Sequence, residues 1–456
     1  MVTTRPSRTP GDRTVCIMGL GYVGLTLATT MAEVGFDVYG IERDEALADR
    51  LQSGDPHFFE PGMAERLNQA LHDKQLKIST TIPAECPATV YIVAVGTPLG
   101  PDQRVRTDIV ETVAAEIAGR MKDGDMVVVR STVKIGTTRG IILPILESSG
   151  KDFDLAFCPE RTQEARALEE LRQLPQIVAG YTKRANDRAA QLFQAVTPTI
   201  IRVSDLETGE VIKMVDNAHR DVYFAFANEV ARICDAVGIS ALEVIQSGKL
   251  GYPRTNLPLP GTVGGPCLTK DPYILAESLE EFGVEPEITL AARHLNERLP
   301  KEAVAHIAGV CSSVGDFPSD PTIALMGLAF KGRPPTDDVR GTTARLVLDE
   351  LREAFPQGRF RGFDAMVSDA VIQGFALEPH SSIESAMTDA NLVVILNNHP
   401  DFAAMPLEEH SDLMARPGLI YDFWNQFTDV HLRLADSVSY IALGSHGRRI
   451  SGPAGR

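Results

Sequence analysis

A glycine-rich turn near the N-terminus constrains the fold of this chain more than any other stretch. The apolar segment Thr14–Met18 is typical of a buried strand, and Gly19-Leu-Gly-Tyr-Val-Gly24 follows it at once. A helical pattern then runs from Leu25 to Val34, and a second strand, Asp37–Ile41, ends in an acidic residue. Glycines between a strand and a helix let the backbone approach a pyrophosphate at the helix N-terminus. The stretch therefore predicts a dinucleotide-binding βαβ unit.

The acidic residue after the second strand bears on which dinucleotide is bound. Glu42 is placed to accept hydrogen bonds from the adenosine ribose and to repel a 2′-phosphate, which favours NAD over NADP. Arg43 beside it weakens that preference. Two threonines that follow later strands lie where a doubly wound sheet binds its ligand. The predicted cofactor contacts are Gly19, Gly21, Tyr22, Val23, Gly24, Glu42, Arg43, Thr97 and Thr132.

The remaining apolar runs predict an α/β fold with two Rossmann-like doubly wound domains. Strands continue to residue 203, which gives a first domain over residues 14–204. Apolar residues at helical spacing predict one long helix from Leu206 to about Val237, within a helical middle region over residues 205–314. New strands from Thr322 onward give a third domain over residues 321–444. We expect the Gly/Arg/Ser-rich tail from Gly444 to be disordered.

A loop rich in glycine and proline, Leu257–Tyr273, carries a single cysteine. Gly and Pro at this density exclude a regular strand and predict a tight, shaped loop. Cys267 lies where a short helix could begin at Leu268, a position that favours a thiolate, and Asp271 follows one helical turn later. Taken alone, this pattern fits either a catalytic nucleophile or a buried structural cysteine.

Composition excludes several classes of protein. A net charge of −17 argues against nucleic acid or an anionic membrane as a partner. The six cysteines have neither disulfide nor metal-ligand spacing, so we expect reduced thiols, no metal site and a cytoplasmic location. No apolar run approaches the roughly 20 residues that span a bilayer.

The ordered motifs together resemble the nucleotide-sugar 6-dehydrogenases, the family of UDP-glucose, GDP-mannose and UDP-N-acetylhexosamine dehydrogenases. The resemblance covers most of the chain, from about Thr14 to Gly444. Its motifs are Gly19-Leu-Gly-Tyr-Val-Gly24, Glu60-Pro-Gly62, Val95-Gly-Thr-Pro98, Ser131-Thr-Val133, Pro159-Glu-Arg161, Lys213 with Asn217, Asn228-Glu229, Gly264-Gly-Pro-Cys267 with Asp271, and Gly327-Leu-Ala-Phe-Lys331.

The resemblance implies an NAD-dependent, four-electron oxidation of a sugar C6 hydroxyl to a uronate. Cys267 would form a thiohemiacetal and then a thioester, although the base of the first step stays open. The catalytic residues it implies are Cys267, Lys213, Asn217, Asp271, Glu160 and Thr132. The substrate contacts it implies are Glu160, Arg161, Glu164, Lys213, Asn217, Arg254, Gly264 and Lys331.

The resemblance also implies a homodimer or a higher homo-oligomer, since Arg254 matches an arginine that reaches the neighbouring subunit's sugar site. The pathway expected from it is the supply of polysaccharide or glycoconjugate precursors.

Three positions depart from the common family pattern. Trp424 stands in place of a usual arginine, which puts a phosphate contact in doubt, and Ala165 stands where glycine is common. The cysteine loop reads Val263-Gly-Gly-Pro-Cys267, which favours a UDP-N-acetylhexosamine substrate, whereas Lys270 favours UDP-glucose. A two-electron dehydrogenase of the 3-hydroxyacid kind and a nucleotide-sugar sensor without activity are the alternatives from other classes.

Overall fold

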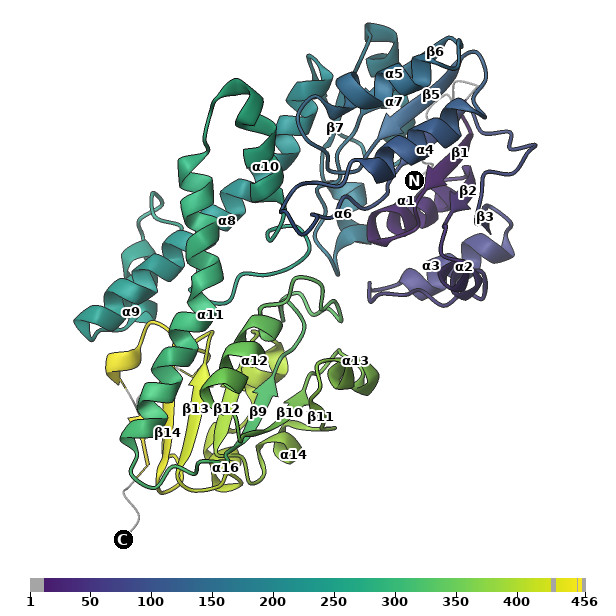
Figure 1. The fold of residues 1–456 in the computed structure, drawn as a ribbon. Coiled ribbons are helices and arrows are strands. Elements are labelled where there is room, and N and C mark those ends of the chain that lie inside the picture. The colour runs from purple at the N-terminus through teal and green to yellow at the C-terminus, as the bar shows by residue number, and fades with distance from the viewer. Residues whose placement is uncertain (1–11, 428–431, 449, 453–456) are drawn as a thin grey trace. The chain divides into compact units, whose positions relative to one another are not determined.

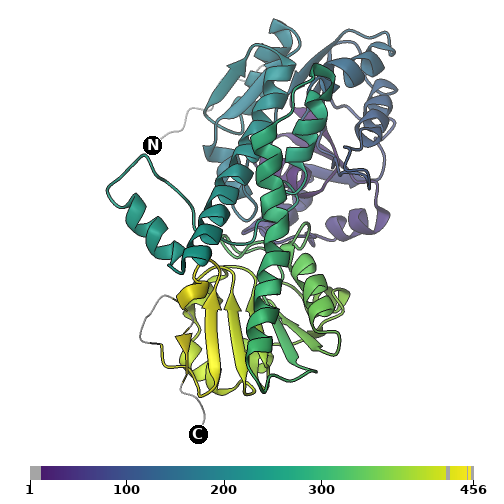
Figure 2. The same ribbon diagram turned by 60° about the vertical axis from the view of Figure 1, so that its left-hand side comes forward.

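The computed structural model describes residues 12–427, 432–448 and 450–452. The chain divides into two compact units. The N-terminal unit runs to Asp216 and includes Tyr273–Glu285, and the C-terminal unit contains Asn217–Pro272 and the chain from Pro286 onward. Each unit is built around one mostly parallel sheet (Figures 1 and 2). The predicted α/β fold with two Rossmann-like sheets and a helical middle region is confirmed.

The N-terminal sheet has the strand order β3-β2-β1-β4-β5-β6-β7-β8, and all neighbouring pairs are parallel except β6 with β7. Its strands are β1 (Thr14–Met18), β2 (Asp37–Ile41), β3 (Leu76–Ser79), β4 (Val90–Val93), β5 (Asp125–Val129), β6 (Phe153–Phe157), β7 (Gln176–Gly180) and β8 (Ile200–Val203). Its helices are α1 (Tyr22–Glu33), α2 (Glu45–Gln52), α3 (Met63–His72), α4 (Asp108–Ala118), η1 (Thr138–Ile142), α5 (Leu143–Glu147), α6 (Ala167–Gln173) and α7 (Lys183–Gln194).

The strand order of this sheet reverses between β1 and β4. Alternation along β1 explains the two cores: Val15 and Ile17 pack on one face, and Cys16 and Met18 on the other. A ligand of an open parallel sheet binds beyond the carboxyl ends of the strands where the order reverses. The glycine turn after β1 lies at this point, as the sequence predicted.

The helical middle consists of α8 (Leu206–Val237), α9 (Ala241–Lys249), α10 (Asp271–Leu279), η2 (Glu280–Phe282) and α11 (Glu287–Ser313). The long helix α8 ends where the sequence predicted, at Val237. Within the C-terminal unit, the end of α8 and the C-terminal half of α11 contribute to the core on one face of the second sheet (Figure 2).

The C-terminal sheet has the order β11-β10-β9-β12-β13-β14-β15, parallel except for the last pair. Its strands are β9 (Thr322–Met326), β10 (Arg359–Phe363), β11 (Glu378–Pro379), β12 (Leu392–Ile395), β13 (Gly418–Asp422), β14 (Val438–Ala442) and β15 (Ile450–Ser451). Its helices are α12 (Thr343–Ala354), α13 (Asp369–Gly374), α14 (Ile383–Met387), α15 (Pro400–Ala404), α16 (Leu407–Asp412) and η3 (His446–Arg448).

The prediction of a disordered tail from Gly444 is wrong for the tail residues that the structure describes. Asp235 of α8 accepts hydrogen bonds from the backbone N–H groups of Gly444 at 3.1 Å and His446 at 2.8 Å. Further on, β15 pairs with β14. Composition suggested disorder because it carries no information on these long-range contacts. Residues 449 and 453–456 of the tail lie outside the described residues.

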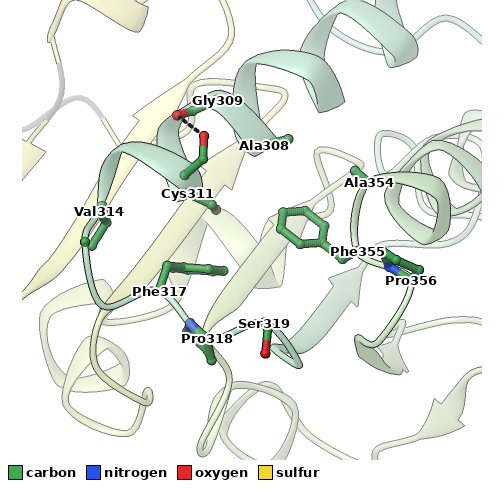
Figure 3. A pocket seen from close by; sticks show the side chains of 12 residues that line it. Ala308, Gly309, Cys311, Val314, Phe317, Pro318, Ser319, Ala354, Phe355 and Pro356 are labelled. Atoms are coloured by element: carbon green, nitrogen blue, oxygen red, sulfur yellow. Dashed lines mark hydrogen bonds between the residues drawn. The ribbon is translucent and has the colours of Figure 1, made fainter.

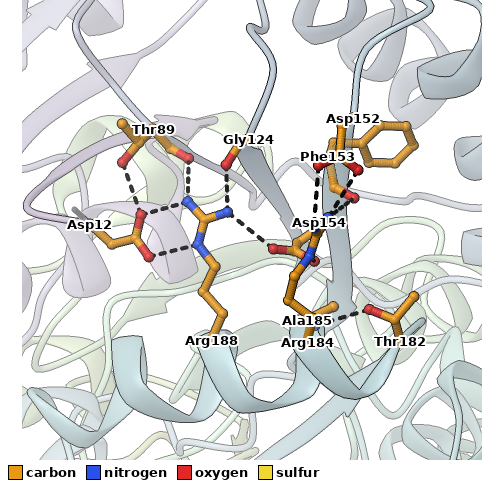
Figure 4. Close-up of polar contacts among 10 residues, drawn as sticks. All are labelled: Asp12, Thr89, Gly124, Asp152, Phe153, Asp154, Thr182, Arg184, Ala185 and Arg188. Carbon is orange, nitrogen blue, oxygen red and sulfur yellow. Dashed lines mark hydrogen bonds and ion pairs between the residues drawn. The ribbon is translucent and has the colours of Figure 1, made fainter. Parts of the chain in front are cut away.

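A cluster of two arginines and three aspartates links α7 to the N-terminal ends of the central strands of the first sheet (Figure 4). Arg188 of α7 donates to both carboxylate oxygens of Asp12, at 2.6 and 2.7 Å, and to Asp154 at 3.2 Å. Arg184, one turn earlier, donates to Asp152 and Asp154. The Arg188 side chain is 19% exposed and that of Arg184 is 57% exposed. Because Arg188 is the more buried of the two, its ion pair with Asp12 should stabilise the fold more than the ion pairs of Arg184.

Arg188→Ala should therefore lower the free energy of unfolding by about 1–3 kcal/mol, because it leaves the Asp12 carboxylate without its cation. Arg184→Ala on the same helix is the matched control and should cost less than about 1 kcal/mol. Urea unfolding followed by circular dichroism measures both. Equal losses would contradict this assignment of the ion pairs.

Candidate active site

The glycines of the first turn differ in what surrounds them. Gly19 has φ +91°, which favours glycine, and a Cβ on Gly24 would lie 1.8 Å from the carbonyl oxygen of Gly19. Gly24 thus allows α1 to start against β1. A Cβ on Gly21 would meet nothing within 4 Å. The space beside Gly21, at the N-terminus of α1, suits the pyrophosphate of a dinucleotide.

Glu42 is held beside this turn by two backbone groups. One carboxylate oxygen accepts from the N–H of Leu20 at 3.1 Å, and the other accepts from the N–H of Asp44 at 3.2 Å. The charge of Glu42 is therefore fixed where a ribose would lie, whereas Arg43 is exposed. These residues fit NAD.

Tyr22 connects the glycine turn to two other loops. Its hydroxyl donates to the carboxylate of Glu60, and it accepts from the backbone N–H of Ala165 at 2.9 Å. Ala165 has φ +66°, a left-handed conformation that glycine adopts at lower cost. This conformation explains why glycine is common at the position, and it means that alanine is strained there. Val23, the next residue of α1, is half-buried and packs against the core beneath.

Two predicted threonines, Thr97 and Thr132, lie in the loops after the neighbouring strands β4 and β5. The Thr97 hydroxyl donates to the carbonyl oxygen of Thr132 at 2.5 Å, and the Ser131 hydroxyl donates to that of Val95 at 2.6 Å. These bonds tie the loop after β4 to the loop after β5. The backbone near Thr132 is thereby tied to the loop after β4, which lies against the glycine turn.

Glu160 forms a buried ion pair that the sequence did not predict. Its carboxylate accepts from the guanidinium of Arg130 and from the N–H groups of Arg161 and Thr162, both at 2.7 Å. Burial alone would raise the pKa of Glu160, but Arg130, the Thr162 N–H and the charge of Lys213 lower it below its ordinary value. Glu160 is therefore ionised at neutral pH. The available sequence signal was Arg130 itself, a charged residue directly after the apolar run of β5.

The other predicted residues of this unit lie on α8 or near it. Lys213 is buried on α8, one helical turn before Asn217. Arg161 donates to Asp216 at 3.2 Å, and Glu164 is half-buried in the same loop.

In the C-terminal unit, the cysteine loop presents one exposed thiol. Cys267 is exposed, and the other five cysteines are buried. The alternative of a buried structural cysteine is therefore wrong. The helix predicted from Leu268 starts only at Asp271, because residues 266–270 form turns, so Cys267 precedes the helix by one turn. The N–H of Asp271 donates to the carbonyl oxygen of Cys267 at 2.9 Å, which fixes the spacing between them.

Asp271 is fully buried and uses both carboxylate oxygens. One accepts from the side-chain amide of Asn217 at 2.6 Å, and the other accepts from the ammonium of Lys270 at 2.6 Å. The bond from Nδ2 fixes the orientation of the Asn217 amide and leaves its second N–H for a ligand. Lys270 supplies the cation that the buried carboxylate needs. Its structural role had no signal beyond its position next to Asp271.

Two glycines before the cysteine lie against a second segment of the C-terminal unit. A Cβ on Gly264 would lie 2.5 Å from the carbonyl oxygen of Gly341, and the N–H of Gly265 donates to that oxygen at 2.8 Å. Gly265 also has φ +98°. Neither position tolerates a side chain, so Gly264 shapes the loop rather than offering a side chain to a ligand.

A buried polar network from α8 and α11 supports this loop from behind. Arg293 donates to the carbonyl oxygens of Leu268 at 3.0 Å and Val263 at 3.4 Å, and to the carboxylate of Asp221 at 2.9 Å. Burial raises the pKa of Asp221 to about 6 despite the guanidinium. The sequence analysis missed both residues, because an Arg and an Asp on separate helices show no common pattern.

The last two predicted substrate contacts are Lys331 and Arg254. The turn after β9 is fixed by Asp364, which accepts from the N–H groups of Leu328 at 2.6 Å and Ala329 at 3.0 Å. Lys331 follows this turn, with its ammonium 5.2 Å from the ring centre of Phe330. Arg254 is exposed and lies over the ring of Tyr252 at 5.6 Å.

Within the described ranges, no three His, Cys, Asp or Glu side chains are arranged to hold a metal ion. Among the helices of the same ranges, none is both long and apolar enough to cross a membrane.

Replacing Arg293 by methionine should lower the free energy of unfolding by about 3 kcal/mol, because Asp221 would be left buried without a cation. The loss should grow as the pH rises from 5 to 8. A buried carboxyl with a raised pKa is neutral below that pKa and becomes a buried charge above it. Urea unfolding at both pH values measures the effect.

Arg298→Met, on the exposed side of the same helix, is the control and should cost less than about 1 kcal/mol. A loss in the Arg293 variant that does not depend on pH would contradict the role given to Asp221.

Three family models match the chain in order. They describe the UDP-glucose/GDP-mannose dehydrogenase family: its NAD binding domain matches residues 13–197, its central domain residues 207–298, and its UDP binding domain residues 324–429. The UDP-N-acetyl-D-mannosamine dehydrogenase of Pyrococcus horikoshii is 31% identical over 86% of this chain and 91% of its own length. The NDP-N-acetyl-D-galactosaminuronic acid dehydrogenase of Ralstonia nicotianae is 30% identical over 86% and 92%.

Solved structures agree with these matches. The UDP-D-ManNAc dehydrogenase structure from Pyrococcus horikoshii covers 95% of this chain and all of its own, with a TM-score of 0.85 at 29% identity. The UDP-N-acetyl-mannosamine dehydrogenase Cap5O from Staphylococcus aureus covers 94% of this chain and 98% of its own, with a TM-score of 0.80 at 29% identity. The chain therefore belongs to the UDP-glucose/GDP-mannose dehydrogenase family and is an NAD-dependent nucleotide-sugar dehydrogenase.

Proposed function

We propose that this chain oxidises the C6 hydroxyl of a UDP-N-acetylhexosamine to a uronate in two steps. One observation carries the proposal: Cys267 is the one exposed cysteine of six, and it lies on a loop whose backbone is fixed by Arg293 and Gly341. A rigidly held, accessible thiol next to polar groups suits covalent catalysis. A two-electron dehydrogenase would not need it.

The balance of the reaction sets what the residues must do. One primary alcohol, two NAD⁺ and one water give one carboxylate, two NADH and three protons. NAD⁺ supplies the hydride acceptor for each oxidation. An aldehyde is a poor hydride donor until a nucleophile makes its carbon tetrahedral. The thiolate of Cys267 would attack this carbon to form a thiohemiacetal, which becomes a thioester when the second hydride leaves.

Lys213 and Asn217 would stabilise the negative charge on the C6 oxygen. Lys213 offers an ammonium, and Asn217 offers the amide N–H that Asp271 leaves unused. Preorganised donors aimed at a developing oxyanion are among the largest contributions to catalysis. Asp271 and Lys270 would act by holding that amide in one orientation.

Hydrolysis of the thioester requires a water molecule and a proton acceptor. Glu160 would serve as the acceptor, because its lowered pKa keeps it ionised. Thr132 would position the water, together with Asp271. The same lowered pKa means that Glu160 carries no proton at the start of this step, so it would act first as the base toward water.

The loop sequence and the relatives support an N-acetylhexosamine as the sugar. Val263 before the glycine pair favours an N-acetylhexosamine, and the names of the Pyrococcus and Ralstonia relatives point to the same class. Lys331, Arg161, Glu164 and Gly264 would contact the nucleotide sugar. The reduced thiols fit a cytoplasmic location. The family supports a role in the supply of polysaccharide or glycoconjugate precursors.

We propose that the enzyme acts as a homodimer or larger homo-oligomer through α8. Three apolar side chains on one face of this helix are exposed: Phe226 by 56%, Ile233 by 54% and Val237 by 66%. Residues spaced by seven and four positions lie on the same helical face. Such a stripe is typical of a surface covered by another chain. Arg254, exposed after α9, would then reach the sugar site of the neighbouring subunit.

The first test is the yield of NADH per sugar consumed. Purified enzyme with NAD⁺ is given UDP-ManNAc, UDP-GlcNAc, UDP-GalNAc, UDP-glucose and GDP-mannose in turn, and NADH is measured at 340 nm against sugar loss by chromatography. We expect two NADH per UDP-N-acetylhexosamine. A yield of two only with UDP-glucose would keep the mechanism and correct the sugar. A yield of one would overturn the thioester mechanism.

Cys267→Ala provides the matched control for the same assay. It should lose at least about 100-fold in the production of uronate, because the aldehyde no longer becomes tetrahedral on the enzyme. Cys311→Ala, at a buried cysteine elsewhere in the chain, should retain turnover. Uronate formation by Cys267→Ala at the wild-type rate would contradict the role of the thiol.

The oligomer is tested by charge substitution on the apolar face of α8. Phe226→Asp with Ile233→Asp should shift the sedimentation coefficient to that of a monomer, because buried carboxylates oppose association. Arg232→Asp, between the two positions on another face, is the control and should leave the assembly unchanged. A wild-type monomer at micromolar concentration would contradict the proposal.

A further inference from the structure

Trp424 occupies a turn that is rigidly fixed after β13. Asp422, fully buried at the end of the strand, accepts from the backbone N–H of Trp424 at 2.8 Å and of Gln426 at 2.6 Å. The Tyr440 hydroxyl donates to the same carboxylate at 2.9 Å. With the side-chain amide of Gln426 at 3.4 Å, four donors on one buried carboxylate leave this turn little freedom. The turn therefore places the indole in one position.

The indole shares an acceptor with the cysteine loop. Its Nε1–H donates to the carbonyl oxygen of Leu396 at 2.9 Å. The hydroxyl of Thr262, five residues before Cys267, donates to that oxygen at 3.0 Å. The end of β12 thus joins Trp424 to the loop through one carbonyl group.

The face of the indole also lies directly against the loop. A Cβ on Gly261 would lie 2.8 Å from three atoms of the Trp424 ring, so only glycine fits there. On its other side, the N–H of Gly261 donates to the side chain of Asn228 on α8 at 2.9 Å. Gly261 is therefore held between an aromatic ring and an amide, and its position depends on both.

We propose that Trp424 is a positioning residue for the nucleophile: the indole fixes the start of the segment that ends at Cys267. Residues 261–265 are all buried, and Gly265 is anchored to Gly341. A displacement at Gly261 therefore reaches the thiol through five packed residues. A misplacement on the order of 1 Å at a catalytic group can cost about 100-fold in rate. The effect on turnover rests on the proposed function, whereas the effect on thiol reactivity does not.

The composition of the chain makes the proposal directly measurable. Trp424 is the only tryptophan, so the indole emission reports this one position. Cys267 is the one exposed cysteine, so iodoacetamide should react there first, which peptide mass spectrometry verifies. Alkylation of Cys267 should shift the emission of the wild-type protein.

The main experiment compares Trp424→Ala, Trp424→Phe and the control Phe355→Leu. Phe355 lines a cavity of about 550 Å³ near the end of α11 and serves as a control aromatic residue away from the cysteine loop (Figure 3). We expect Trp424→Ala to change the alkylation rate and to lower kcat, each by about tenfold or more, with KM nearly unchanged. Trp424→Phe keeps a ring against Gly261 and should stay within about threefold of the wild type, as should the control.

A reciprocal substitution separates positioning from loss of stability. Gly261→Ala pushes the indole from the loop side, so it should shift the Trp424 emission and change the alkylation rate in the same direction as Trp424→Ala. If Trp424→Ala does not fold, this variant and Trp424→Phe decide. Wild-type alkylation in Trp424→Ala or Gly261→Ala would overturn the proposal. So would a raised KM with unchanged kcat, because the indole would then contact substrate instead.

If the wild type oxidises none of the sugars, the proposed function fails, while the alkylation and emission results still test the positioning role.

Discussion

The buried ion pair of Arg293 and Asp221 is the interaction on which the shape of the site most depends. Arg293 contacts the cysteine loop on both sides of Cys267, at the carbonyl groups of Val263 and Leu268, while Asp221 supplies the charge that allows a guanidinium to be buried. A Gly- and Pro-rich loop has no hydrogen-bond pattern of its own, so its carbonyl groups must find donors elsewhere. Arg293 of α11 provides two of these donors, and Asp221 of α8 holds the guanidinium in place. The loop is therefore only as rigid as the packing of these helices.

Much of the fold follows from the sequence because the two sheets are buried and parallel. Strands such as β1 and β9 begin and end where their apolar runs predict, since a strand covered on both faces shows as an uninterrupted apolar segment. The strand β3 was missed because Leu76–Ser79 alternates with polar residues at the edge of the sheet. The order of the tail was also missed, because its partner Asp235 lies far away in the sequence.

The candidate site was predictable where a local motif carries the chemistry. Cys267, Asp271 and the glycine turn were identified from short spacings, and the family supplied Lys213 and Asn217. Residues that act through long-range contacts gave no such signal. Arg130 pairs with Glu160 across two loops, and Lys270 becomes meaningful only because Asp271 is fully buried. Sequence patterns thus give the reacting groups, while the groups that orient them come from tertiary structure.

The two sheets also place a carboxylate in the same way. After β2, Glu42 accepts one backbone N–H from the glycine turn of the neighbouring strand, and after β10, Asp364 accepts two in the same way. For Glu42 this has a consequence for protein engineering. One of its carboxylate oxygens accepts from the N–H of Leu20, inside the glycine turn that is expected to bind the pyrophosphate. An attempt to convert the enzyme to NADP by replacing Glu42 with a neutral or basic residue would also release that turn. Coenzyme selectivity and the geometry of phosphate binding therefore change together, and a successful conversion needs another acceptor for the backbone N–H of Leu20.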